Sequence, residues 1–172
     1  MTQLENAGTA RYIQNPPNDQ RIIDRCHALG LTLLQAVQLA NADDPADPQA
    51  LLRVLGLDFV TYEPLVGHKQ SNGLQMAAMS CSVSYRGSLT KDGLLTILTT
   101  GVVPAEFFAH IGHFLDEVSA VVILRGVEEA ARKSQIPAHQ IWKNLAQLAV
   151  RHSDYRKPLW ALFAATDPAP SC

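Results

Sequence analysis

The sequence predicts an α+β fold, in which a three-stranded antiparallel sheet is flanked by N-terminal and C-terminal helices. Residues 74–86 alternate apolar and polar side chains, which is the period of a strand with one buried face. Residues 20–41 and 104–122 instead repeat apolar side chains every three or four positions, as amphipathic helices do. Helical patterns on both sides of a strand-like middle predict the α+β class.

The ends of the chain differ from its middle. Residues 1–18 are polar and contain an Asn-Pro-Pro-Asn run, so we expect a flexible N-terminal arm. Residues 167–172 are expected to be a flexible tail. The intervening residues 19–166 are numerous enough to bury one core, which predicts a single domain.

Two helices are expected before the sheet. Asp19 suits the cap of a helix over residues 20–41, with a bend at Gly30. The Asp-Pro pair at 47–48 suits a cap followed by a first helical position, and Gly56 suits a helix end. These signals predict a short second helix between them.

Three strands are expected next, over residues 57–66, 74–86 and 94–99. The first and third segments are rich in branched or aromatic side chains, which favour strands. The links at 67–73 and 87–93 are bounded by glycines and are short enough for antiparallel hairpins. Such a sheet leaves its edges exposed, and an exposed edge favours strand addition by a protein partner or by a second copy.

Composition argues against several classes of protein. The formal net charge of −2 at pH 7 produces no strong field toward nucleic acid or anionic lipid. The three cysteines lack the regular spacing of a disulfide framework, which predicts a reducing, cytoplasmic setting. The polar start lacks the apolar core of a signal peptide. No stretch reaches the ~18 to 20 apolar residues of a membrane span, so we expect no membrane contact.

Four metal-capable side chains share one stripe of the predicted 104–122 helix: Glu106, His110, His113 and Glu117. Imidazole and carboxylate groups bind Zn, Fe or Mn ions, and His68 on a predicted hairpin loop is a candidate further ligand. The stripe also has a structural explanation. A carboxylate in the first turn and acid–histidine pairs at i, i+4 stabilise an ordinary helix. A Glu-x-x-His pair, which would supply a second ligand set, is not present in the sequence.

Residues 128–147 have the outline of a helix–turn–helix. The second helix would present four outward side chains suited to bases and phosphates: His139, Gln140, Lys143 and Asn144. Three basic neighbours would add phosphate contacts: Arg132, Lys133 and Arg151. Two helices joined by a short turn are also common in helical domains that bind no DNA, so both interpretations stay open.

The sequence contains no strong catalytic spacing. A nucleophile elbow, a phosphate-binding loop and a dinucleotide-binding glycine pattern are all missing. We therefore expect a non-enzymatic binding or regulatory protein without a cofactor, acting through a protein-partner surface. Nucleic-acid contact through the basic C-terminal helices is one form of this function. The alternatives are a metal-dependent enzyme that uses His110, His113 and Glu117 with a Zn, Fe or Mn ion, and a small-molecule binder.

Overall fold

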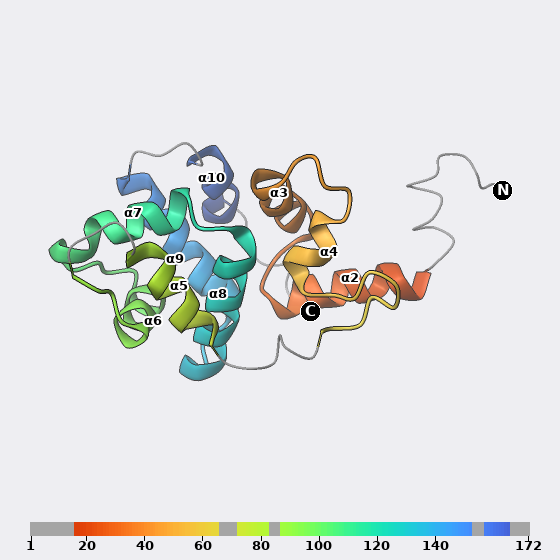
Figure 1. Ribbon diagram of the computed structural model, residues 1–172, viewed down its shortest axis with the longest axis horizontal. Coiled ribbons are helices and arrows are strands. Elements are labelled where there is room, and N and C mark those ends of the chain that lie inside the picture. Colours follow the sequence, from red (N-terminus) through yellow and green to blue (C-terminus); the bar gives the residue numbers. More distant parts are fainter. Residues whose placement is uncertain (1–15, 66–71, 83–86, 153–156, 166–172) are drawn as a thin grey trace.

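The computed structural model describes residues 16–65, 72–82, 87–152 and 157–165. The regular structure of these residues is helical (Figure 1). In chain order the elements are α2 (Pro16–Ala28), α3 (Leu33–Asp43), α4 (Ala50–Leu55), α5 (Gly73–Ser82), α6 (Lys91–Thr100), the 3-10 turn η2 (Ala105–Phe107), α7 (Phe108–Asp116), α8 (Ala120–Ser134), α9 (Ala138–Arg151) and α10 (Lys157–Ala165). α2 begins inside the predicted arm. The rest of that arm and the predicted tail lie outside the described residues.

The predicted three-stranded sheet is wrong, and the α+β class and the sheet edge as a docking site are wrong with it. Within the described residues, β pairing is limited to an isolated antiparallel bridge between Leu57 and Pro64. The second predicted strand, 74–86, is helix α5 as far as Ser82, and its remaining residues are outside the description. The third predicted strand, 94–99, lies inside α6.

The sequence of α5 is compatible with both a strand and a helix, which explains the error. Its buried side follows the helical spacing i, i+3, i+4, i+7 and consists of Leu74, Ala77, Ala78 and Cys81. Met79, expected on the apolar face of the strand, is instead 59% exposed. The hydroxyl of Ser82 donates to the carbonyl oxygen of Ala78, so a serine expected on a polar strand face is satisfied within a helix.

Threonines gave α6 its resemblance to a strand. Thr90 caps the helix, since its hydroxyl oxygen accepts from the backbone N–H of Gly93. Three threonine hydroxyls inside the helix donate to carbonyl oxygens one turn earlier: Thr96, Thr99 and Thr100. Gly101 then ends the helix in the left-handed conformation, with φ of 74°.

The predicted 20–41 helix is two helices rather than one bent helix. Gly30, just after α2, is in the left-handed conformation with φ of 73°. A Cβ at this position would lie 2.5 Å from the backbone nitrogen of His139, so only glycine permits the close approach to α9. α3 then opens with a capping box, in which Thr32 and Gln35 each accept from the other's backbone N–H.

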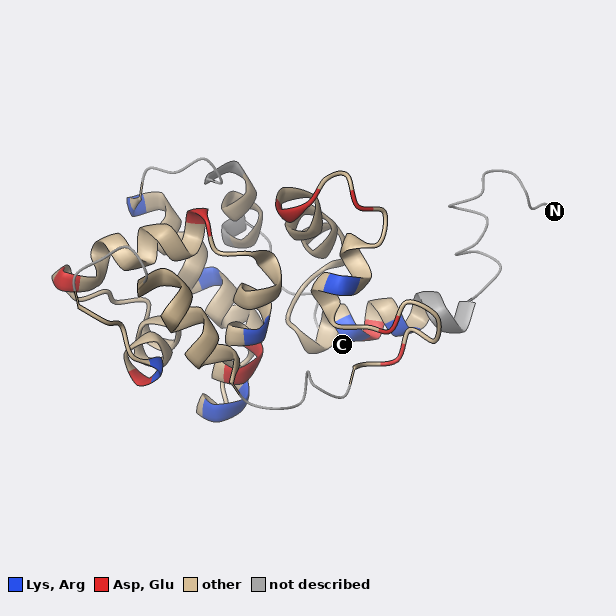
Figure 2. Ribbon diagram, in the orientation of Figure 1, with Lys and Arg blue, Asp and Glu red and all other residues tan. Residues whose placement is uncertain are grey.

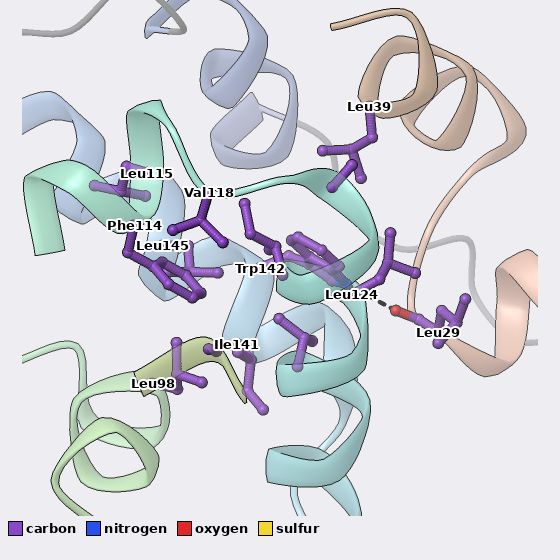
Figure 3. Packing of buried hydrophobic residues seen from close by; sticks show 14 of the residues in the cluster. Leu29, Leu39, Leu98, Phe114, Leu115, Val118, Leu124, Ile141, Trp142 and Leu145 are labelled. Atoms are coloured by element: carbon purple, nitrogen blue, oxygen red, sulfur yellow. Dashed lines mark hydrogen bonds between the residues drawn. The ribbon is translucent and has the colours of Figure 1, made fainter. Parts of the chain in front are cut away.

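The helices form two groups that share one core (Figure 1). α2, α3 and α4 lie at one end, and α8 and α10 of the larger group contact them. α9 is central in the larger group, where it packs against α6, α7, α8 and α10. Trp142 of α9 stacks on Trp160 and Phe163, and its indole N–H donates to the carbonyl oxygen of Leu29 at 2.7 Å (Figure 3). One side chain therefore joins both groups.

The chain turns sharply between α6 and α7. The axes of α6 and of residues 105–116 are bent by 104° relative to each other. By length and composition these two segments together would suffice for a membrane span, but no single helix in the described residues is long and apolar enough to cross a membrane.

Candidate functional site

The predicted 104–122 helix is broken, so the metal-capable stripe does not lie on one helix. Its residues are divided among η2, α7 and the residue that follows α7, Glu117. Ser119 caps the start of α8 with its hydroxyl, and the carboxylate of Asp43 accepts from the backbone N–H of Ala120 at 2.9 Å. A capped helix start so soon after Glu117 separates α8 from α7.

The two histidines of the stripe make separate contacts. His110 is buried, and its Nε2 lies 3.0 Å from the carbonyl oxygen of Gly87. Nδ1 of His113 lies 3.0 Å from a carboxylate oxygen of Glu117. Among the described residues, no group of three His, Cys, Asp or Glu side chains is arranged to hold a metal ion. His68, the candidate further ligand, lies outside those residues.

The predicted helix–turn–helix outline is present as α8, a short turn and α9. Gln135 takes the left-handed conformation of the turn, with φ of 60°, and Pro137 precedes α9 as its N-cap residue. Beyond its first turn, α9 reaches solvent only along a narrow stripe: Lys143, Gln147, Val150 and Arg151. A recognition helix has to protrude to enter the major groove, whereas α9 has α6 and α10 packed against it.

The prediction that Asn144 points outward is wrong, because its side chain is only 7% exposed. Its amide nitrogen donates to the carbonyl oxygens of Leu98 at 2.9 Å and Thr99 at 3.3 Å, near the end of α6. Its amide oxygen accepts from the exposed Gln140 at 3.2 Å. The last carbonyl groups of a helix lack partners within it, so Asn144 stabilises α6 instead of facing a DNA base.

The candidate phosphate-binding residues do not gather on one face (Figure 2). Lys133 lies 3.4 Å from Glu129, a buried carboxylate one turn earlier on α8. Arg132 is exposed at the same end of α8, whereas Arg151 lies at the far end of α9, about 20 Å along that helix. Two further candidates on α9 are half-buried: His139 and Lys143. The four arginines and lysines therefore do not form one continuous basic patch.

No family model, curated protein or solved structure matches this chain. Cys26 and Cys81 are buried, and burial raises the pKa of each thiol to about 11. At neutral pH such a thiol is almost entirely protonated, and the thiolate is the reactive form. Neither cysteine is suited to nucleophilic catalysis.

The connection between α6 and α7 is held against α9 at two points. Asn144 holds the end of α6 at the first point. At the second, His152 is 6% exposed, and its Nε2 lies 3.0 Å from the carbonyl oxygen of Phe108. The rings of His152 and Phe108 also stack, with centroids 4.0 Å apart. These two points are about 12 Å apart on a helix, so the connection runs alongside the last two turns of α9.

Apolar side chains remain exposed along this connection. Val102 is 65% exposed and Phe108 47%. Glu106, two residues before Phe108, and Arg151, next to His152, are both exposed, and neither forms a salt bridge with another described residue. We call these four residues the Phe108 surface. A charged margin around apolar side chains is the usual composition of a protein interface.

The Phe108 surface was not predicted from the sequence. Residues 101–103 fall between the third predicted strand and the predicted 104–122 helix, and no contact residue was predicted there. One signal was available, because Phe108 lies outside the apolar arc of the predicted 104–122 helix while Phe107 lies within it. An aromatic residue off the buried arc of a helix is a candidate for an exposed contact. Its position against His152 depends on a contact between segments distant in sequence.

Proposed function

We propose that this chain is a non-enzymatic binding protein that docks a protein partner on the Phe108 surface. The contact between Phe108 and His152 carries the proposal. The Phe108 ring is half exposed, yet it stacks on a buried imidazole that also contacts the Phe108 carbonyl oxygen. An aromatic side chain that is held in place before binding loses little conformational entropy on binding, so it is well suited to anchor a partner.

The other members of the surface support the same function. Single exposed apolar side chains are ordinary, but several close together are typical of interaction sites. Val102 supplies a second exposed apolar side chain on the same connection as Phe108, and Glu106 and Arg151 supply charge at the margin. Enzymatic chemistry has less support, because the described histidines of the candidate metal stripe make separate contacts and the described thiols are buried.

A photo-crosslinking amino acid at Val102 tests this proposal in the cells that make the protein. We expect a crosslink to one protein species, identified by mass spectrometry. Val60 is the matched control, because it is an 82% exposed valine in the connection after α4, which belongs to the other group of helices (Figure 1). No crosslink to that protein is expected from position 60.

The crosslinked protein is then purified and titrated with the full chain. Val102→Asp should weaken binding at least about tenfold, since a carboxylate would be buried in an apolar contact. Val60→Asp should leave the affinity unchanged, and matching unfolding temperatures would show that both variants fold. Equal effects of the two substitutions, or no crosslinked protein, would contradict the proposal.

Duplex DNA tests the alternative of nucleic-acid binding. That alternative would be supported if the chain binds duplex DNA, if this binding survives Val102→Asp, and if it is lost when Arg132 and Lys133 are neutralised.

A further inference from the structure

The Phe108 surface is complementary to itself in charge. Glu106 on η2 and Arg151 on α9 each lie within two residues of the contact between Phe108 and His152. Both side chains are exposed, and neither is in a salt bridge with another residue that the structure describes. In a two-fold symmetric pair, residue i of one copy faces residue j of the other, and the reverse. One acid and one base on the same surface can therefore form two ion pairs between copies.

We propose that the partner on the Phe108 surface is a second copy of this chain, related by a two-fold axis. This inference rests on the proposed function and names its partner. Glu106 of each copy faces Arg151 of the other, and the exposed apolar side chains of the two copies meet between these ion pairs. A partner of opposite charge would require a surface of one sign, whereas here the two signs balance. The formal net charge of −2 is too small to keep two copies apart.

The small size of the surface indicates weak association. Stable interfaces bury roughly 800 Å² on each partner, which is more than the two apolar and two charged side chains of this surface provide. We therefore expect a dissociation constant on the order of 10 to 100 µM. Association has to be measured over a concentration range that includes these values.

Charge reversal in the full chain tests the pairing. In sedimentation equilibrium, Glu106→Arg or Arg151→Glu alone places like charges opposite each other at both contacts. Each single variant should weaken dimerisation at least about tenfold. The double variant Glu106→Arg/Arg151→Glu restores opposite charges at both contacts, so it should dimerise like the unmodified chain. An equal mixture of the two single variants should form mixed dimers for the same reason.

Two matched controls separate this pairing from general effects of charge. Lys91→Glu reverses an exposed charge in the first turn of α6, away from the Phe108 surface, and should not change dimerisation. Val102→Asp should weaken dimerisation, whereas Val60→Asp should not. Circular dichroism and unfolding temperature report whether each variant folds, and recovery in the double variant excludes misfolding as the cause of a loss.

Three results would overturn the second-copy proposal. They are a chain that stays monomeric at several hundred micromolar, a dimer that neither single reversal weakens, and a double variant that does not recover. If the chain is monomeric but a different protein crosslinks at Val102, this inference fails and the proposed function stands. If the chain is monomeric and nothing crosslinks at Val102, both fail.

Discussion

Arg25 and Glu128 form a bidentate ion pair between α2 and α8, although they are 103 positions apart in the sequence. Nη1 of Arg25 lies 2.9 Å from Oε2 of Glu128, and Nη2 lies 3.1 Å from Oε1. Nε of Arg25 also donates to the carbonyl oxygen of Leu55 at 2.8 Å, at the end of α4. The two side chains are 11% and 24% exposed. One guanidinium group therefore connects three helices from both groups.

This pair should contribute measurably to stability. Arg25→Ala should lower the free energy of unfolding by about 2–3 kcal/mol, because it removes the guanidinium from a partly buried carboxylate and from a helix-end carbonyl. A double-mutant cycle with Glu128→Ala, measured by urea denaturation, should give a coupling energy of about 1–2 kcal/mol. The exposed pair of Arg21 and Glu63, 3.0 Å apart, is the control. Its coupling should stay below about 0.5 kcal/mol, and equal couplings would contradict this interpretation.

Two glycines at the contact between α5 and α8 should respond differently to alanine. A Cβ at Gly73 would lie 2.4 Å from the carbonyl oxygen of Arg125, whereas a Cβ at Gly126 would come no closer than 3.4 Å to Ala77. Gly73→Ala should therefore lower the free energy of unfolding by more than about 2 kcal/mol, because a backbone has to move. Gly126→Ala should raise it by up to about 1 kcal/mol, since alanine favours a helix. Urea denaturation of both variants checks this ordering.

Substitutions of Asn144 should act through stability. Asn144→Ala should lower the free energy of unfolding by about 1–3 kcal/mol, because the carbonyl oxygens of Leu98 and Thr99, one buried and one partly buried, lose their donor. Asn144→Asp should lower it further, since a carboxylate would face those oxygens. Gln147→Ala is the control. It should have little effect on the free energy of unfolding, because Gln147 is exposed on α9. Unchanged thermal unfolding of the Asn144→Asp variant would show that the side chain faces solvent after all.

The buried thiols should be slow to react in the native protein. In a Cys172→Ser background, only Cys26 and Cys81 can be labelled by an aromatic disulfide reagent. With a pKa of about 11, each buried thiol is ionised in only about one molecule in a thousand at pH 8. Labelling at pH 8 should thus be at least about a hundredfold slower than in denaturant, where the pKa is ordinary and the thiols are accessible. Similar rates in the two conditions would contradict their burial.

The same thiols should affect the pH dependence of stability. Their folded pKa of about 11 exceeds the ordinary value of 9.0, so between these values the folded protein binds more protons than the unfolded chain. Their contribution is fully present below about pH 9 and is lost as the pH rises toward 11. The Cys26→Ala/Cys81→Ala variant should therefore lose less free energy of unfolding across this window than the unmodified chain. An identical loss would contradict the raised pKa.

Boundaries set by short-range chemistry could be predicted from the sequence. α4 ends at Gly56 in the left-handed conformation, as its glycine indicated. α9 starts directly after Pro137, a residue that has no backbone N–H and so suits a helix start rather than a helix interior. Caps and prolines act on backbone groups only a few residues away, so nothing distant has to be known. Some segments, such as the one around Cys81, suited both a strand and a helix. Local chemistry did not decide between these two structures.

The sequence by itself determined the end of α4 and the start of α9, and which side chains have metal-binding or base-reading chemistry. Only the tertiary structure decided which of them face solvent. Asn144 is buried because the end of α6 needs its amide, and His110 is buried near the carbonyl oxygen of Gly87. Phe108 is exposed but ordered because His152, 44 positions later, supports its ring. Burial depends on which distant elements pack together, and that packing is a property of the whole chain.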